Sequence, residues 1–423
     1  MLFVVSNFVM NGGTTFVFRM AEERYKRGLA TTILSIESNV NKELVARVKE
    51  FASFYLLEDF VTFGLGKVFV KQLVITAPLK KAKLKKVIDD SHGNVHCMGV
   101  YGLLLSRRFS QFYPKKLNIT TAVYHQNEYL FKSKKYYFKD IFELILQSFS
   151  SDQMIFFNEK NRQDYANKFN LDFEKSPLTP IGLNLSDRVW RSTKTDSDKL
   201  KIISIGNLFD FKKYIEAMIE NFNEILRLDD RFEFHIYGDG PEKDRLYDLV
   251  LSKGLSGKVF LHGQFDYALL TDVVRGSFAF LGGGTAIIEA SSYGIPSIIG
   301  IESFELPETY GFFYEINGLD YNEYKFDMPR RSFSNCIRVL LDASEWNDVS
   351  HRCYIKSQEF SIEKTLETFE LSFSSSALTD IKSVSFSNSR LLISLLSMAF
   401  NYYLKLDDGI RNRRLQGNFD ESH

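Results

Sequence analysis

A run of three glycines is the stretch of this chain whose residue types most directly suggest ligand chemistry. The run follows the apolar segment 277–281 and precedes a helical pattern that must stop at Gly294-Ile295-Pro296; its members are Gly282, Gly283 and Gly284. Glycine lets the backbone approach a ligand closely, and the first N–H groups of a helix have no partner inside the helix. A strand, glycine turn and helix start in this order favour an anion, most naturally a phosphate.

Two side chains of the predicted helix extend this chemistry. Thr285 and Glu289 are four residues apart, so they share one helix face, and the Glu289 carboxylate is expected to point toward the group that lies over the turn. A phosphate together with a hydroxyl-bearing group fits this pair. A tight turn between a strand and a helix, without any ligand, explains the glycines equally well when they are taken alone.

A second glycine turn lies near the start of the chain, at Gly12 and Gly13. The apolar residues predict a buried strand over 1–6, a helix after the turn that closes at Gly28, and a further strand over 30–36. This order places both glycines at the carboxyl edge of a parallel sheet, where α/β folds bind ligands. A plain connection between the first strand and the first helix is the alternative.

A histidine ends another predicted strand, which spans residues 120–126. His125 at a strand tip suits substrate positioning or proton transfer, because imidazole titrates near neutral pH. A hydrogen bond from His125 to neighbouring backbone is an equally good explanation of its position from the local sequence.

Length and composition indicate a soluble globular protein of two domains. The chain has 423 residues, more than one hydrophobic core usually supports, with 44% hydrophobic and 25% charged residues. Three scattered cysteines exclude a disulfide framework or a zinc site and fit a reducing cytoplasm. The first residues lack the charged region and cleavage site of a signal peptide, and no apolar run reaches the roughly 20 residues of a membrane span. The acidic triplet 196–198 lies in polar sequence, where a metal site is not expected.

Charge is unevenly distributed along the chain. Residues 61–140 hold 15 Lys or Arg against 4 Asp or Glu, interleaved with Tyr and Phe, although the whole chain has zero net charge. Such a surface suits an anionic membrane, and a solvated face is the alternative. Nucleic acid is not predicted as a partner, because no recognised binding module is present. The apolar and aromatic segment 391–406 predicts either an interfacial helix or a helix docked on the protein body.

The alternation of strands and helices predicts a doubly wound α/β architecture. We expect an N-terminal domain over 1–185, a linker over 186–200, and a second domain over 201–355. A late helix over 356–375 is expected to return to the N-terminal domain, and residues 376–423 form a tail with a possible membrane association. In the second domain, strands are predicted over 202–205, 232–237, 258–263 and 277–281, with helices over 214–226 and 266–275.

Four motifs of the second domain occur in the order found in one enzyme family. They are Ser204-Ile205-Gly206 with Lys212, Tyr237-Gly238-Asp239-Gly240-Pro241-Glu242, Val259-Phe260-Leu261-His262-Gly263, and Glu289-Ala290 with Gly294-Ile295-Pro296. Together they closely resemble the C-terminal domain of family 4 glycosyltransferases of the GT-B fold. Gly12, Gly13 and His125 match the N-terminal glycine loop and strand-tip histidine of that family. The resemblance covers about residues 1 to 370.

The resemblance implies two Rossmann-like domains that face a cleft, followed here by a helical tail. It implies a nucleotide-sugar as co-substrate, no cofactor and no metal, with the donor on the second domain and a lipid-linked glycan acceptor on the first. Lys212, beside Gly206, would neutralise the diphosphate. The turn at Gly283, Gly284 and Thr285 would donate N–H groups to it. Glu289 would accept from the ribose, and His125 would lie near the transferred sugar. The implied enzyme retains anomeric configuration and builds cell-surface glycans such as capsule, O-antigen or exopolysaccharide, at the inner face of the cytoplasmic membrane.

Two departures from the family pattern concern the sugar and phosphate ends of the site. Asn207 stands where an arginine is common, and Leu281 stands where many members have a second glutamate, for which Glu302 or Glu305 is a candidate substitute. These departures keep open a second hypothesis, a catalytically silent nucleotide-binding subunit of a polysaccharide-assembly complex. A GT-B sugar-nucleotide epimerase is a weaker third hypothesis, because nothing in the chain resembles its catalytic acids.

Overall fold

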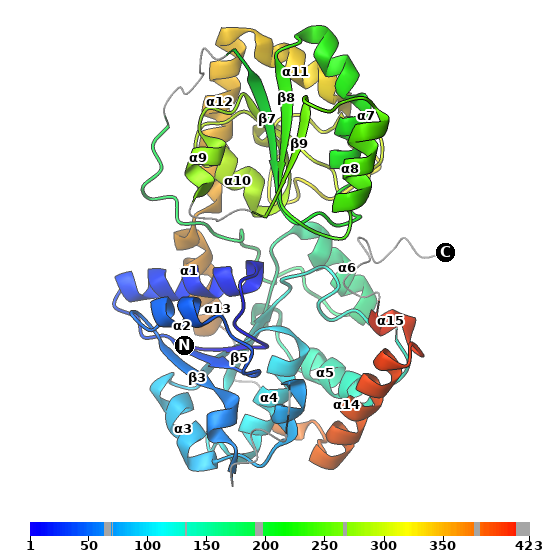
Figure 1. The fold of residues 1–423 in the computed structure, drawn as a ribbon. Helices are drawn as coiled ribbons and strands as arrows, with labels where there is room; N and C mark the ends of the chain where they lie inside the picture. The colour runs from blue at the N-terminus through cyan, green and yellow to red at the C-terminus, as the bar shows by residue number, and fades with distance from the viewer. Residues whose placement is uncertain are drawn as a thin grey trace. The chain divides into compact units, whose positions relative to one another are not determined.

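The computed structural model describes residues 1–62, 69, 71–131, 133–190, 198–264, 269–375 and 381–411. These residues form two compact units (Figure 1). Unit 1 comprises Met1–Gly182 together with the segment that begins at Ile362, and unit 2 comprises Leu183–Ser361. The N-terminal unit is therefore completed by a segment that follows unit 2 in the sequence.

Unit 1 is built on a six-stranded parallel sheet with strand order β3-β2-β1-β4-β5-β6. The strands are β1 (Leu2–Val5), β2 (Thr32–Ser35), β3 (Ser53–Leu56), β4 (Asn94–Cys97), β5 (Asn118–Ala122) and β6 (Met154–Ile155). The chain starts at β1, runs to one edge, and returns to β4 on the other side of β1. The switch point of the sheet therefore lies between β1 and β4, where doubly wound folds bind ligands.

Helices flank this sheet (Figure 1). The first six are α1 (Gly12–Lys26), α2 (Lys42–Val48), α3 (Lys81–Asp90), α4 (Gly99–Phe112), α5 (Tyr137–Gln147) and α6 (Glu159–Phe169). The returning segment adds α13 (Ile362–Ser375), α14 (Asn388–Tyr403) and α15 (Asp408–Arg411). Short 3-10 turns join them, among them η3 (Lys71–Thr76).

Helix α13 contributes to the core of unit 1. Phe369 is fully buried, with its ring centroid 5.7 Å from that of Phe16 on α1 and 4.9 Å from that of His96 on β4. Arg24 of α1 forms an ion pair with Glu370. Because these contacts join the two ends of the chain, unit 1 depends on residues more than 300 positions apart.

Unit 2 is built on a five-stranded parallel sheet with strand order β11-β10-β7-β8-β9. The strands are β7 (Leu200–Ile205), β8 (Phe232–Tyr237), β9 (Val259–Gly263), β10 (Ala279–Gly282) and β11 (Ser297–Ile299). The helices are α7 (Lys213–Leu228), α8 (Lys243–Ser252), α9 (Leu270–Val274), α10 (Gly284–Ser292), α11 (Phe333–Leu341) and α12 (Ala343–Ser357). A two-stranded ribbon of β12 (Glu308–Thr309) and β13 (Arg331–Ser332) closes the loop after β11.

The predicted α/β class and doubly wound sheets are confirmed, but some element bounds were wrong. Strand β5 ends at Ala122, so His125 lies in the turn beyond the strand and not at its last residue. Helix α9 begins at Leu270, and residues 266–268 of the predicted helix lie outside the described part of the chain. The same holds for Asp196 and Ser197 of the acidic triplet.

The described residues contain no helix that is both long and apolar enough to cross a lipid bilayer.

Candidate functional site: the carboxyl edge of the unit 2 sheet

Lys212 occupies the centre of the site and is positioned by a glycine. It is the last residue before α7, and its ammonium group lies directly over Gly206, where β7 ends. A Cβ atom at position 206 would overlap Lys212 Nζ, and Gly206 has a φ of 145°, a backbone conformation that disfavours other residues. The glycine is therefore required by the position of the lysine.

The loop between Gly206 and Lys212 is fixed by the loop that follows β8. Gly206 N donates to Tyr237 O at 2.9 Å, and Leu208 N donates to Asp239 O at 2.9 Å. The glycines at 238 and 240 allow this contact, because a Cβ at either would overlap the backbone of Gly206 or Leu208. The loops that contain Gly206 and Gly238 are thus held together by backbone hydrogen bonds.

Glu302 is the charged partner of Lys212. It follows β11, and its backbone N donates to Asn322 O at 2.8 Å while its carboxylate accepts from Asn322 Nδ2 at 2.7 Å. The next residue, Ser303, donates from its N–H to Phe211 O at 2.7 Å, which ties this turn to the residue preceding Lys212.

Desolvation governs the charge state of this cluster. It raises the pKa of Glu302 to about 7, although Lys212 and Asn322 both oppose the rise. It lowers the pKa of Lys212, which Glu302 partly offsets. It also raises the pKa of Glu323 to about 8, to which the neighbouring Glu302 and Asp320 add. The cluster therefore exchanges protons in the neutral pH range.

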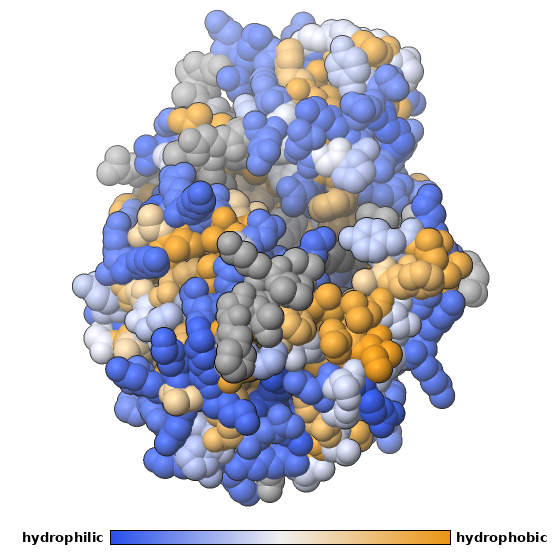
Figure 2. Space-filling view, turned by 60° about the horizontal axis from the view of Figure 1, so that its bottom comes forward, coloured by the Kyte–Doolittle hydropathy of each residue, from blue (hydrophilic) through white to orange (hydrophobic). Residues whose placement is uncertain are grey.

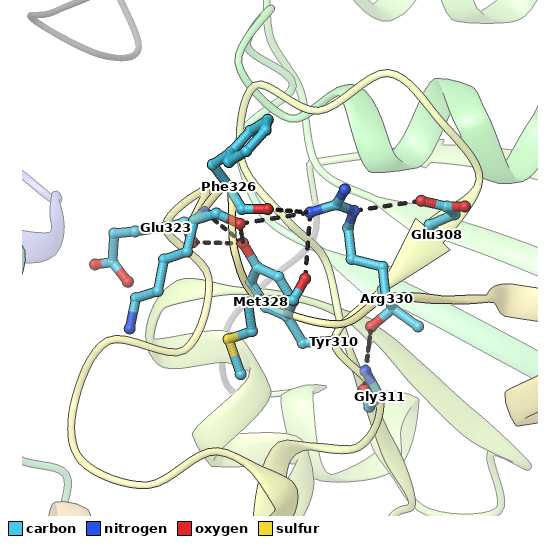
Figure 3. A network of polar contacts seen from close by, with 9 residues as sticks. Glu308, Tyr310, Gly311, Glu323, Phe326, Met328 and Arg330 are labelled. Atoms are coloured by element: carbon cyan, nitrogen blue, oxygen red, sulfur yellow. Dashed lines mark hydrogen bonds and ion pairs between the residues drawn. The ribbon is translucent and has the colours of Figure 1, made fainter.

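The loop that carries Asn322 and Glu323 is held by a polar network around Arg330 and Tyr310 (Figure 3). Tyr310 Oη accepts from Lys325 N at 2.6 Å and donates to Glu323 O at 3.1 Å. Arg330 binds the Glu308 carboxylate at 3.4 Å and the carbonyl oxygen of Met328 at 3.3 Å. Its guanidinium also stacks on the ring of Phe304, 5.0 Å from the centroid. These contacts fix a segment that has no regular secondary structure.

The predicted strand, glycine turn and helix start are confirmed at β10 and α10. The helix begins at Gly284, and within the described chain no side chain caps its N-terminus. Gly283 packs against Asn322, since a Cβ there would lie 2.9 Å from Asn322 Nδ2, and Tyr321 Oη donates to Gly284 O at 2.9 Å. The same loop therefore contacts both Glu302 and the glycine turn.

Further along α10, Thr285 is half-buried and Glu289 is buried, with 8% of its surface exposed. Leu281 stands where many family 4 glycosyltransferases have a glutamate. It is fully buried inside β10 and pairs with Ile298 of β11. A charged side chain at position 281 would be desolvated without a partner. Glu302, which follows the neighbouring strand β11, instead accepts a hydrogen bond from Asn322.

The predicted residues of unit 1 lie at the carboxyl edge of its own sheet. Asn11 Oδ1 accepts from Thr14 N at 3.0 Å and so caps α1 beside Gly12 and Gly13. A Cβ at Gly13 would lie 3.4 Å from Met98 Cε, at the start of α4. The turns after β1 and β4 therefore meet at the switch point.

His125 is exposed in the turn after β5, and its Nδ1 accepts from Asn127 N at 3.1 Å. The neighbouring Glu128 reaches Gly99, where a Cβ would lie 2.7 Å from the Glu128 Oε1 atom. Glu128 carries no recognisable signal in the sequence, because a lone glutamate in a turn belongs to no pattern.

The predicted site residues thus fall into two sets, one in each unit. Unit 2 brings Gly206, Lys212 and the glycine turn together with Glu302, Asn322 and Glu323. Unit 1 brings Gly12 and Gly13 to the same sheet edge as His125. In the described part of the chain, no group of three or more His, Cys, Asp or Glu side chains is arranged to hold a metal ion.

Comparisons with known proteins agree with this geometry. Residues 187–310 match the family model described as glycosyl transferases group 1. No curated protein sequence matches the chain significantly.

Several solved structures share the fold at low sequence identity. TarM is 12% identical with a TM-score of 0.62, over 88% of this chain and 98% of TarM. Anabaena Alr3699/HepE in complex with UDP is 13% identical with a TM-score of 0.60, over 88% and 99%. The lipopolysaccharide outer core galactosyltransferase WaaB is 12% identical with a TM-score of 0.57, over 89% and 99%. These similarities show the GT-B fold, and with the family model they support a glycosyltransferase enzyme.

Proposed function

We propose that this protein transfers a sugar from a nucleotide-sugar donor, held at the carboxyl edge of the unit 2 sheet, to a glycan acceptor. The observation that carries the proposal is that Lys212 and the uncapped N-terminus of α10 both lie at this edge of the sheet. Lys212 supplies a cation, and the turn at Gly283, Gly284 and Thr285 supplies backbone N–H groups. The UDP in the S. aureus TarM variant and HepE structures supports a nucleoside diphosphate as the ligand.

The chemistry of sugar transfer explains why these groups are needed. The bond between the anomeric carbon and the diphosphate oxygen breaks, and its electron pair stays on the departing diphosphate. Fixed cations and N–H dipoles stabilise that charge without reorganising. Bound diphosphate also favours the ammonium form of Lys212, which offsets the lowering of its pKa by desolvation. Glu289 on the same helix is proposed to accept from the ribose hydroxyls, and no metal ion is required.

Glu302 is proposed to supply the carboxylate at the sugar end of the site. Its hydrogen bond with Asn322 and its electrostatic interaction with Lys212 support this role. The other candidate, Glu305, is exposed. From unit 1, His125 and the turn at Gly12 and Gly13 are proposed to meet the acceptor and the transferred sugar.

For the acceptor we propose a lipid-linked glycan of the cell surface, elongated with retention of configuration. WaaB, a lipopolysaccharide outer core galactosyltransferase, supports this class of acceptor. The cationic α3, on which Lys81, Lys83, Lys85 and Lys86 are all exposed, supports contact with an anionic membrane.

A catalytically silent nucleotide-binding subunit is the second candidate function. Asn207 removes a cation next to Gly206, and Leu281 removes a carboxylate from β10.

One experiment separates the two functions. Purified protein is tested against a panel of nucleotide-sugars for binding by thermal shift and for turnover with lipid-linked glycan acceptors. Stabilisation by one donor together with release of its nucleoside diphosphate supports the enzyme. Stabilisation without hydrolysis or transfer, with every acceptor of the panel, supports the silent subunit. If no nucleotide or nucleotide-sugar stabilises the protein, the donor site itself is refuted.

A further inference from the structure

Helix α14 is apolar on two sides. On one side Leu391 and Leu395 are buried against unit 1, and Ser394 Oγ accepts from Phe138 N at 3.2 Å. On the other side Ile393 is 65% exposed and Phe400 is 60% exposed. A surface helix normally turns polar residues to solvent, so the outer face of α14 is unusual.

The apolar surface continues beyond the end of the helix and onto its neighbour. We name it the α14 face, and its exposed members are Ile393, Leu396, Phe400, Tyr403, Leu404 and Leu406. Leu144 of α5, the helix against which α14 packs, is also exposed. Figure 2 shows apolar side chains gathered over this part of unit 1. A contiguous exposed patch of this kind marks an interaction surface.

The α14 face is fixed to the protein body at its carboxyl end. Asp407 is buried, and its carboxylate accepts from Lys134 N at 3.0 Å and from Tyr136 Oη at 2.8 Å. Asn401 Nδ2 donates to the same tyrosine oxygen at 3.0 Å. The exposed residues therefore belong to a docked segment that keeps its apolar side outward.

Positive charge predominates around the α14 face, although Asp408 at its carboxyl end is exposed. Residues 381–406 contain three basic residues and no Asp or Glu. Exposed lysines of neighbouring segments add to it: Lys71 on η3, which packs against α14, and Lys134 and Lys135 beside Asp407. The polar positions of the helix are serines, asparagines and one arginine, with no acidic residue among them.

We propose that the α14 face docks this protein onto an anionic lipid bilayer. Apolar side chains would enter the boundary between headgroups and acyl chains, the tyrosines would lie at the interface, and the surrounding lysines and arginines would meet lipid phosphates. A second copy of the chain fits less well, because self-association would bring the same cationic rims together. This inference deepens the proposed function, since it places unit 1 where a lipid-linked acceptor lies.

The test uses the full-length protein and sedimentation with vesicles of phosphatidylcholine alone or of phosphatidylcholine and phosphatidylglycerol in equal amounts. We expect binding to the anionic vesicles only. The double variant L396D/F400D should lose that binding by roughly tenfold or more, and the charge variant K134E/K135E should also weaken it, the more so as salt falls. The control L371D changes a leucine of α13 that is 68% exposed and should bind like wild type.

Three outcomes would overturn the proposal. Binding of wild type to neither vesicle refutes it, as does equal binding of L396D/F400D and wild type at matched melting temperatures. A dimer in solution that L396D/F400D dissociates, without change in vesicle binding, assigns the face to a second copy instead. Nucleotide binding is measured on the same samples. If wild type binds no nucleotide, the donor site is refuted, and the vesicle result still tests the α14 face.

Discussion

Lys212 and Glu302 each oppose the effect of desolvation on the other's pKa. The carboxylate raises the pKa of the lysine that desolvation lowers, and the lysine limits the rise in the pKa of the carboxyl group. Neither group reaches its position alone, because Gly206 makes room for the ammonium group and Asn322 holds the carboxylate. A substitution at one of them therefore changes the protonation of the other.

Replacing Lys212 by alanine should weaken UDP binding by about 10- to 150-fold, which corresponds to about 1.5–3 kcal/mol for a hydrogen bond to a charged group. Calorimetric titration measures this loss. Lys213→Ala is the matched control, because Lys213 forms its ion pair with Asp210. Equal affinities for the two variants would exclude Lys212 from the phosphate site.

Glu302 and Glu323 should each contribute a loss of stability as pH rises from about 5 toward their folded pKa values. Glu302 and Glu323 have raised pKa values of about 7 and about 8, so the folded protein holds protons that the unfolded chain has already released above its ordinary glutamate pKa. Each group contributes a slope of up to about 1.4 kcal/mol per pH unit, and this contribution levels off above its folded pKa.

Glu302→Gln should remove the contribution of this group between about pH 5 and 7, and the difference in urea unfolding midpoint between the variant and wild type across this range measures it. Glu305→Gln is the control, since Glu305 is exposed. The same pH dependence in Glu302→Gln and wild type would contradict the assignment.

At the scale of elements, the site depends on loops that interlock at one sheet edge. The glycines after β7 and β8 allow two loops to share backbone hydrogen bonds, and the loop before β13 is shaped by Tyr310 and Arg330 (Figure 3). The strands fix where each loop begins. The side chains at the site are then positioned by contacts among loops.

Gly206→Ala should displace Lys212, because the added methyl group would occupy the place of its ammonium group. We expect at least about a tenfold loss of UDP affinity in calorimetric titration, comparable with the loss of one charged contact. Gly254→Ala is the control: it also has a positive φ, 66°, but open space around it. It should cost about 1 kcal/mol of stability and leave affinity unchanged. Loss of affinity in both variants would point to general backbone strain.

At the scale of the whole molecule, unit 1 is assembled from both ends of the chain. Helix α13 packs on α1, and α14 packs on α5 and η3, so the returning segment contributes both to the core and to the surface of the unit. The α14 face would then place unit 1, to which we assign the acceptor, at a membrane surface.

Phe369→Ala should destabilise the protein by about 3–5 kcal/mol, because it opens a cavity between α13, α1 and β4. Leu371→Ala, on the exposed side of the same helix, should change stability by less than about 0.5 kcal/mol. Urea unfolding followed by circular dichroism measures both. A small loss for Phe369→Ala would show that α13 is dispensable to unit 1.

The sequence by itself determined the local parts of this architecture. The strand and helix around Gly283, the loop from Gly206 to Lys212, and the parallel class of both sheets follow from apolar periodicity and glycine position. These are properties of short segments, in which each residue's environment depends mainly on its neighbours along the chain.

Only the tertiary structure shows which distant residues lie beside the predicted ones. Glu302 was one of two candidates, and we propose it over Glu305 because it interacts electrostatically with Lys212, 90 positions earlier, and accepts a hydrogen bond from Asn322 in a loop that has no periodicity. Tertiary packing also determined that β5 ends at Ala122, before His125, and that one apolar side of α14 faces outward. Sheet order and loop contacts join segments far apart in sequence, and no local pattern encodes that register.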